Sequence, residues 1–439
     1  MPAIPEPIPP PPIPVPVPAP EAAPEEEVEL TAAELAAMGL STETGDSSAA
    51  TVDTALKFSG FADVGLITGA IPESSPWSGV GSVGRHSSFY VGNLNLYLAK
   101  NLTSSIRMFG EIRFMLLPNG APDHTATGGQ LIDTGVDDYT DFGRTVEWGG
   151  INIQRLYIEW SPYRALQFRA GQYLTPYGIW NVDHGSPTIV PVQKPFIIGQ
   201  RLFPDRQTGV EILGQFDASA HNSFGYNVTL SNGTGPASSY RDLDSNKAIG
   251  GRVWWRFDGL GELRVGGSGY YGRYTAATQT PGLGPDGMHA VYLENIQAAY
   301  DTLSLAADLK YTVAGLLFQS ELVTQQRKYI ESGRVGSVQP LVGQYVAPND
   351  KLSWGVYGLI GYRFEWFGIM PYFLLQYITS TEVNTGAVLD NSGWSAGLNI
   401  RPIDSLVFKL EYDEGRFPKG SLISSDPIRI FQAQIAWAF

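Results

Sequence analysis

The sequence of 439 residues contains no cysteine, so neither disulfide bonds nor thiolate metal sites hold the fold together, and anchoring through a lipid-modified cysteine is excluded. Charged residues make up only 16% of the chain, below the roughly 25% that is usual in soluble domains. No run of about 18 apolar residues occurs, so no membrane-spanning helix is predicted. The formal net charge of -14 argues against nucleic-acid binding, which needs a basic face.

Glycine and aromatic residues, in contrast, are abundant. The chain has 50 Gly, 22 Tyr, 20 Phe and 10 Trp, and its mean hydropathy of -0.08 is close to zero. A transmembrane barrel has this balance, because its lipid-facing side chains alternate one for one with polar side chains that face the lumen. The composition therefore favours a transmembrane barrel.

The end of the chain alternates between apolar and polar residues. The apolar positions are Phe431, Ala433, Ile435, Trp437 and Phe439, with Gln432 and Gln434 between them. A period of two predicts a strand with one face in lipid and the other in a watery lumen. The terminal aromatic residue also resembles the C-terminal signal that the outer-membrane barrel-assembly machinery reads. The alternative is the last strand of a soluble β-sandwich, which the repetition of the pattern along the chain disfavours.

Pairs of alternating segments joined by short turns recur from residue 56 onward. In the clearest pair, Arg155 and Glu159 fall between apolar residues ahead of a turn at 161–164. A charge at every second position is costly in lipid but normal in a water-filled lumen. We predict about sixteen strands, an even number that places both ends of the barrel chain on one side. They lie near residues 56–68, 94–98, 106–114, 155–160, 166–170, 208–217, 222–231, 247–258, 262–274, 303–312, 316–328, 351–364, 368–380, 391–401, 405–417 and 428–439.

The predicted fold class is all-β: a transmembrane antiparallel β-barrel over residues 56–439, preceded by a Pro-rich extension with a short helix. Short turns belong on the periplasmic side and long loops on the outside. Residues 291–300 are either part of a long loop or a strand extension, because a further strand would make the number odd. A barrel of about sixteen strands is wide enough for a water channel.

Residues 1–55 form the N-terminal extension. Proline dominates residues 2–24 and predicts a polyproline-II rod, and a capping box at Thr31–Glu34 predicts a short helix over about 31–38. This arm is either a tail without a partner or a periplasmic tether that contacts a periplasmic protein or peptidoglycan through residues 1–50. The start of the chain lacks the basic and apolar regions of an export signal, so we expect that the signal has been removed from this numbering.

Four segments in a fixed order carry a family resemblance. They are Gly171–Gly178, Leu230–Gly235, Lys247–Val253 and the hairpin 307–322. In this order they resemble the phosphate-selective porin family (the O and P porins) and its relatives that pass dicarboxylates or other anions. The resemblance covers about residues 56–439. It implies a sixteen-stranded trimeric channel whose third extracellular loop, here about 176–207, folds inward to narrow the pore.

One region departs from that family. A phosphate-selective channel needs clustered Lys and Arg at its constriction, but the segment Ala276–Asp301 contains neither. We therefore do not extend phosphate selectivity to this chain.

Charges at the narrowest section of a pore decide its selectivity. The alternation predicts these lumen-lining residues: Arg107, Glu111, Arg113, Arg155, Glu159, Arg169, Arg252, Arg256, Arg264, Asp308, Lys310, Glu321, Arg363, Lys409 and Glu411. Basic residues outnumber acidic ones, which favours a mildly anion-attracting wall. The alternative is that these residues pair with one another and only solvate the wall.

The inward loop contributes the candidates for the constriction. They are Asp183, His184, Lys194, Arg201, Asp205 and Arg206. Lys194 and Arg201 would attract an anion, whereas Asp183 and Asp205 would oppose it or pair with them. We expect a narrow opening of mixed charge.

Motifs for catalysis and metal binding are weak. His184 follows Asp183, but no second histidine lies at ligand spacing, and the acidic run at 137–141 lacks the glycine and final glutamate of a calcium loop. No nucleophile motif and no phosphate-binding glycine loop occurs. We therefore predict no enzyme activity, no cofactor and no metal site.

The pattern as a whole predicts an outer-membrane porin of a Gram-negative bacterium. It would be a passive channel for small hydrophilic solutes, leaning toward anions or organic acids, with membrane lipids and two further copies of the chain as its partners. The first alternative is a docking barrel whose Pro-rich arm links the outer membrane to the cell wall or a periplasmic complex. The second is a barrel enzyme or adhesin that works through its loops.

Overall fold

The computed structural model describes residues 54–70, 87–116, 148–182, 185–199, 201–235, 242, 244–283, 290–334, 337–338, 345–346, 349–382, 388–417 and 426–439. The chain divides into two compact units, residues 1–42 and 43–439, and every described residue belongs to the second. The Pro-rich run, the helix predicted over 31–38 and the acidic run at 137–141 lie outside the described residues.

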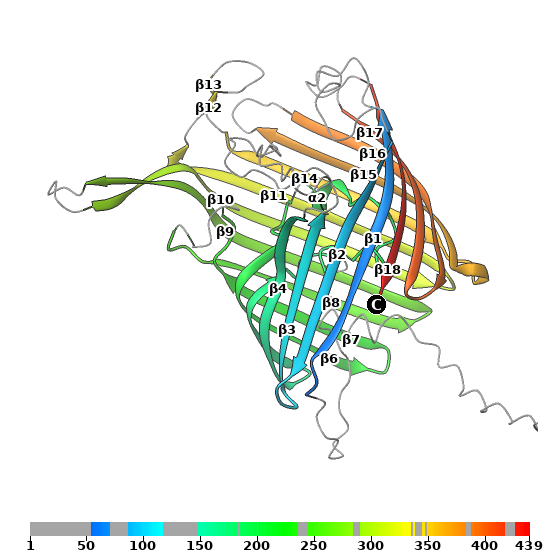
Figure 1. Ribbon diagram of the computed structural model, residues 1–439. Coiled ribbons are helices and arrows are strands. Elements are labelled where there is room, and N and C mark those ends of the chain that lie inside the picture. The colour runs from blue at the N-terminus through cyan, green and yellow to red at the C-terminus, as the bar shows by residue number, and fades with distance from the viewer. Residues whose placement is uncertain are drawn as a thin grey trace, which may run out of the picture. The chain divides into compact units, whose positions relative to one another are not determined.

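Sixteen strands form a closed antiparallel barrel (Figure 1). Each barrel strand is hydrogen-bonded to its neighbours in the chain, and β1 pairs with β18 to close the ring. The barrel strands are β1 (Lys57–Ala70), β2 (Ser88–Asn101), β3 (Ile106–Leu116), β4 (Trp148–Tyr163), β5 (Leu166–Leu174), β6 (Arg206–Ser219), β7 (Asn222–Ser231), β8 (Ala248–Gly259), β9 (Gly261–Leu283), β10 (Ala290–Val313), β11 (Leu316–Arg334), β14 (Lys351–Tyr362), β15 (Ile369–Glu382), β16 (Val388–Ile403), β17 (Leu406–Arg416) and β18 (Ile428–Ala438). The smaller elements are α2 (Phe196–Gly199), β12 (Ser337–Val338), β13 (Tyr345–Val346) and η1 (Trp366–Gly368).

The last residues of the chain close the barrel. Ile435 of β18 lies opposite Val64 of β1, and the pairing continues along both strands. The backbone N–H of Gly60 donates to the carbonyl of Phe439 at 2.8 Å, and the N–H of Phe439 donates back at 2.9 Å. The prediction that the alternating C-terminal run is a barrel strand is confirmed.

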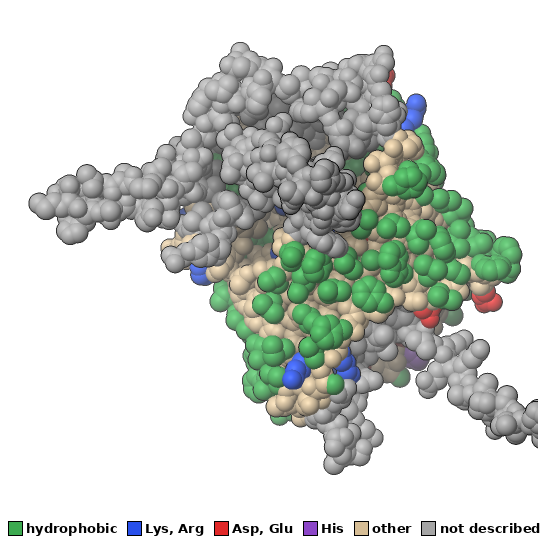
Figure 2. Space-filling view, viewed as in Figure 1, with side chains coloured by type: hydrophobic (Ala, Val, Ile, Leu, Met, Phe, Trp, Pro, Cys, Tyr) green, Lys and Arg blue, Asp and Glu red, His purple; other side chains and the backbone are tan. Residues whose placement is uncertain are grey.

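The two faces of the wall differ in polarity. Along β4, Leu156 and Ile158 are 53% and 47% exposed on the outside, whereas Arg155 and Glu159 are 3% and 4% exposed on the inside. Figure 2 shows hydrophobic side chains spread over the outer wall, with few charged side chains among them. An exterior of this kind suits lipid, and an interior of this kind suits water.

Tight turns join the strands at one end of the barrel. Ala314 and Gly315 connect β10 to β11 with φ angles of 46° and 82°. Two positive φ angles are what a two-residue hairpin turn requires, because this turn matches the twist of the flanking strands. In the part of the chain that the structure describes, no helix has the length and apolarity that a membrane crossing needs.

Strands β9 and β10 are longer than the sequence predicts. The predicted strands cover 262–274 and 303–312, but β9 runs to Leu283 and β10 begins at Ala290, and the two stay paired throughout. Of the two alternatives for residues 291–300, the strand extension is confirmed, and residues 275–283 extend β9 in the same way. The added residues lack a clear apolar alternation, so the sequence pattern alone left the choice open.

Candidate pore constriction

The segment between β5 and β6 leaves the wall and enters the lumen. We call residues 175–205 the inner segment. Its two ends meet, because the N–H of Thr175 donates to the carbonyl of Asp205 at 3.1 Å. The side-chain amide of Asn181 donates to the carbonyl of Thr175 and to the carbonyl of Asp205, each at 2.8 Å. The inner segment is thus a loop with a closed neck, and its body lies inside the barrel (Figure 1).

The outgoing half of the inner segment reaches β11. Tyr177 shares a hydrogen bond of 2.9 Å with Thr229 of β7, and the N–H of Trp180 donates to the carboxylate of Glu321 at 3.0 Å. Gly178 has a φ of +70°, and a Cβ atom there would collide with the Glu321 carboxylate. Glycine is therefore required where the backbone passes over this buried acid.

The middle of the inner segment is held by β1 and β17. The hydroxyl of Ser186 donates to Asp63 at 2.6 Å. The backbone N–H groups of Val192 and Gln193 donate to the two oxygens of Glu411 at 3.0 and 2.7 Å. These contacts lie far from β11 around the ring, so the inner segment crosses the lumen.

The returning half of the inner segment follows the wall back toward β6. The N–H of Phe196, at the start of α2, donates to Gln376 of β15 at 2.8 Å. The carbonyl of Leu202 accepts from Ser304 of β10 at 2.6 Å and from Gln325 of β11 at 2.7 Å. The inner segment is therefore fastened along most of its course.

A hydrophobic cluster lies between the inner segment and the wall. The segment contributes Trp180, Ile189, Ile197 and Leu202, and the wall contributes Val323, Tyr357, Leu359, Leu374 and Ile378. Burial of apolar surface stabilises by about 25 cal/mol per Å². This cluster turns one side of the lumen into a packed core and leaves the wall on the β2–β5 side to bound the remaining opening.

The exposed edge of the inner segment is basic. Lys194 is open to water within the lumen, and the Arg201 side chain is 75% exposed and lies 3.3 Å from Asp205. Arg206, directly after the segment, donates to Gln154 of β4 at 2.6 Å. The structure thus brings these four predicted constriction residues to one region. The other two, Asp183 and His184, lie outside the described residues.

Burial and neighbouring charges shift the pKa of Lys194. The surrounding protein partly desolvates the Lys194 ammonium, although the side chain keeps contact with water, and this desolvation, with the charges of Arg113 and Arg201, lowers the pKa of Lys194 from its ordinary value. Asp205 acts in the opposite direction. Arg113 of β3 and Arg201 thus act on Lys194 electrostatically, and Arg206 lies close enough to act on Arg113, so cations outnumber the one carboxylate, Asp205.

Many of the predicted lumen residues pair with one another. Glu159 lies between Arg107 and Arg169 at 2.9 and 2.7 Å, and Arg169 continues to Glu211 at 2.6 Å. Further pairs join Arg155 to Glu111 at 2.6 Å, Arg252 to Asp308 at 2.5 Å and Arg256 to Asp258 at 3.1 Å. These residues therefore follow the alternative in which charged lumen residues pair with one another.

Other predicted lumen residues have structural partners. Glu321 and Glu411 hold the inner segment and also accept hydrogen bonds from Tyr357 and Tyr372 at 2.7 and 2.6 Å. The remaining contacts are Lys409 with the Pro191 carbonyl at 3.1 Å, Arg264 over the Trp254 ring at 4.5 Å, Arg363 with the Met370 sulfur at 3.6 Å, and Lys310 opposite Arg264 in the register of β9 and β10.

Sequence reasoning missed several residues of this region. Glu211 stands between Val210 and Ile212, so the alternation already carried its signal. Asp63 stands between Ala62 and Val64 of β1, so the alternation also carried a signal for it. Gln376 carries no comparable signal, because an uncharged side chain does not reveal that a loop docks on it.

Replacing Glu111 by alanine is expected to destabilise the barrel. Arg155 is 3% exposed and lies 2.6 Å from Glu111, which is fully buried. Removing one partner of a buried ion pair lowers the free energy of unfolding by about 3–5 kcal/mol, because the other charge stays buried. Urea unfolding in detergent, followed by tryptophan fluorescence, measures the loss. Glu111→Gln keeps an acceptor for Arg155 and should lose less; equal losses would contradict this role.

The described region gathers charged side chains around the inner segment. Within the described ranges, no three His, Cys, Asp or Glu side chains gather into a metal-binding group. What the constriction offers is a fixed loop with a basic edge beside a charged wall. Such an arrangement can sort solutes by size and charge.

Comparison with known proteins identifies the fold. No protein-family model matches the chain, and no curated protein matches it in sequence. The trimer form of OmpT, an outer-membrane protein of Vibrio cholerae, aligns with a TM-score of 0.51 and 12% identity, covering 88% of this chain and 99% of that one. An anion-selective porin from Comamonas acidovorans aligns with a TM-score of 0.50 and 11% identity, covering 88% and 100%.

OmpF of Salmonella typhi gives a similar result. Its complex with daunomycin aligns with a TM-score of 0.50 and 11% identity, covering 88% of this chain and 98% of that one. Identities this low relate the backbones and not the activities. We conclude that this chain has the sixteen-stranded β-barrel fold of the outer-membrane porins.

Proposed function

We propose that this protein is a passive diffusion channel for small hydrophilic solutes in the outer membrane of a Gram-negative bacterium. One observation carries the proposal: a closed barrel with an apolar exterior contains an inner segment that crosses its lumen and is fastened to the wall. A wall of this kind suits lipid, and a narrowed, charged lumen suits selective passage of solutes rather than catalysis.

The preferred solutes are anions or organic acids. Arg113 and Arg201 act electrostatically on Lys194, Arg206 acts on Arg113, and Asp205 supplies the opposing charge beside Arg201. Their positive field would raise the local concentration of anions despite the formal net charge of -14. The anion-selective porin among the similar structures is consistent with this preference.

A homotrimer surrounded by lipid is the proposed assembly. One similar structure is described as a trimer form. The broad apolar exterior of the barrel offers enough surface for contacts both with lipid and with two further copies of the chain. Crosslinking of the detergent-purified protein would report the number of subunits, and a monomer at all concentrations would contradict the trimer.

A planar lipid bilayer tests the proposed channel directly. Purified protein should produce stepwise increases in conductance as single molecules insert. A folded barrel that inserts without conducting would overturn the proposal, because the lumen would then be closed to ions.

Raising the pH should weaken the anion preference earlier than an ordinary lysine would allow. Lys194 is cationic below its pKa and neutral above it, and its pKa is lowered by desolvation and by neighbouring arginines. Its charge is therefore lost before pH 10.4, the usual value for lysine. The ratio of anion to cation permeability, measured from pH 6 to pH 10, should fall in the wild type. Lys194→Arg should hold its ratio over the same range; parallel declines would contradict the assignment.

A further inference from the structure

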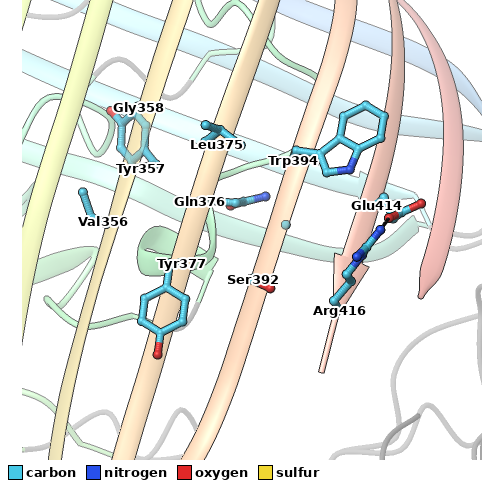
Figure 3. A pocket seen from close by; sticks show the side chains of 11 residues that line it. Val356, Tyr357, Gly358, Leu375, Gln376, Tyr377, Ser392, Trp394, Glu414 and Arg416 are labelled. Carbon is cyan, nitrogen blue, oxygen red and sulfur yellow. Dashed lines mark hydrogen bonds and ion pairs between the residues drawn. The ribbon is translucent and has the colours of Figure 1, made fainter. Parts of the chain in front are cut away.

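A trough on the outer wall of β14–β17 combines an apolar floor with a charged end. It encloses about 500 Å³. Figure 3 shows Leu375 and Tyr377 of β15, Trp394 of β16 and Arg416 of β17 around it. Small-molecule pockets in proteins measure about 300–1,000 Å³, so this hollow is large enough to hold a ligand.

The strand register explains the shape of the trough. The register sets Gly358 beside Leu375, Leu375 beside Trp394, and Trp394 beside Glu414. Gly358 has no heavy atom within 4 Å of the place where a Cβ would stand, so the wall is open at this point. Large side chains beside a residue without one leave a groove that runs across the strands.

Glu414 and Arg416 line the end of the trough, and Arg429 pairs with Glu414 beside it. Glu414 lies opposite Arg429 in the register of β17 and β18. It accepts hydrogen bonds from Arg416 at 2.8 and 2.6 Å and from Arg429 at 3.2 Å. The side chains of the two arginines are 63% and 57% exposed, whereas that of Glu414 is 8% exposed.

The charges at this end do not cancel. Each guanidinium carries five N–H donors, and Glu414 takes only three hydrogen bonds from the pair. One net positive charge and several outward donors therefore stand at the end of an apolar groove. Exposed charge on a lipid-facing wall is costly unless an opposite charge meets it.

We propose that this trough binds an anionic phospholipid-like lipid, with an acyl chain along Leu375, Tyr377 and Trp394 and its phosphate on Arg416 and Arg429. Arginine binds phosphate through two parallel hydrogen bonds, and Trp and Tyr favour the level of lipid headgroups. This inference rests on the proposed location of the barrel in a membrane.

A second hollow on the outer wall is an apolar groove without exposed arginines at its end. It lies on β3–β6, measures about 400 Å³ and is lined by Ile158, Trp160 and Val210. Its two charged residues, Arg169 and Glu211, pair with each other at 2.6 Å. That hollow suits an acyl chain but offers no exposed cation to a phosphate.

Native mass spectrometry of the full chain in detergent tests the lipid site. The probes are phosphatidylglycerol, which is anionic, and phosphatidylcholine, which carries no net charge. The wild type should retain phosphatidylglycerol several-fold better. Arg416→Gln/Arg429→Gln should abolish that difference, whereas Arg164→Gln, which removes an exposed arginine paired with Asp217 at 2.6 Å elsewhere, should keep it. Equal retention of both lipids by the wild type, or an unchanged preference in the double variant, would overturn the proposal.

A second variant separates a built site from general attraction of charge. Ser392→Trp would fill the trough and leave both arginines in place, so retention of phosphatidylglycerol should fall. Unchanged retention would overturn the acyl-chain part of the proposal.

The variant Trp394→Cys tests whether a second copy of the chain covers the trough. Because the chain has no other cysteine, an intersubunit disulfide could form only at this position. Such a disulfide would also contradict the lipid site. Mass spectrometry measures lipid retention independently of conductance. If the protein failed to conduct in a planar bilayer, the proposed channel would be overturned but the lipid result would stand.

Discussion

Replacing residues 177–203 by a short Gly-Ser linker is expected to raise the single-channel conductance several-fold. The neck of the inner segment is already closed, with the N–H of Thr175 at 3.1 Å from the carbonyl of Asp205, so a few residues can span it. The deletion removes the chain that crosses the lumen and leaves the sixteen-stranded ring unbroken. Current through a water-filled pore increases with its open cross-section, so a wider lumen should conduct more. Planar bilayer recordings of wild type and variant in the same salt measure the change.

The deletion will also cost stability. It exposes Val323, Leu359 and Leu374, which are buried against the inner segment, to the water of the lumen. A lower melting temperature is therefore expected together with the higher conductance. Conductance equal to the wild type in a folded variant would show that the inner segment does not limit the pore.

A pair of point substitutions tests the same role without a deletion. Glu321→Ala/Glu411→Ala removes the two buried carboxylates that accept from the backbone of Trp180 and from that of Val192 and Gln193. The loosened inner segment should give noisier and larger currents and should be cleaved faster by protease. This variant keeps the prediction testable if the deletion does not fold.

Reversing the charge of the basic edge is expected to reverse the ion preference. Lys194→Glu/Arg201→Glu places two carboxylates beside Asp205, where two cations stood next to Arg113. The charge at the narrowest section governs which ions concentrate there, so the permeability ratio should change from anion-favouring to cation-favouring. The sign of the reversal potential in a salt gradient measures this.

A matched control carries the same change in charge away from the constriction. Lys100→Glu/Arg164→Glu alters two exposed basic residues at the short-turn end of the strands, in β2 and between β4 and β5. It should leave the sign of the preference unchanged. If both double variants shifted the potential equally, selectivity would follow from overall charge and not from the inner segment.

The barrel itself was predictable because each strand carries its own signal. In β7 the predicted and observed bounds coincide at 222–231, and in β4 the charged residues face inward as the alternation requires. A period of two reports contact with lipid on one face, so it acts strand by strand and needs no knowledge of distant contacts. The same reasoning could not choose between loop and strand extension at residues 291–300, and it missed the continuation of β9 over residues 275–283, because strands continue there without that constraint.

The constriction was predictable only in part. The alternation showed that Glu321 faces inward but not that it holds the backbone of Trp180, which is 141 positions away. Nor could it decide which charges pair, since Arg169 has acidic neighbours on two strands. Such contacts depend on how the inner segment lies in the lumen, and the apolar-polar alternation of a single strand does not indicate its position.

The reversal potential of the wild-type protein in a salt gradient would show whether the lumen conducts ions and which sign of charge it prefers. The protein would be inserted into a planar bilayer with concentrated potassium chloride on one side and dilute potassium chloride on the other. We expect steady conductance and a potential whose sign shows preference for chloride, because the positive charges of Arg113 and Arg201 act on Lys194 at the inner segment. Insertion of folded barrels without any conductance would show that this barrel is not a diffusion channel.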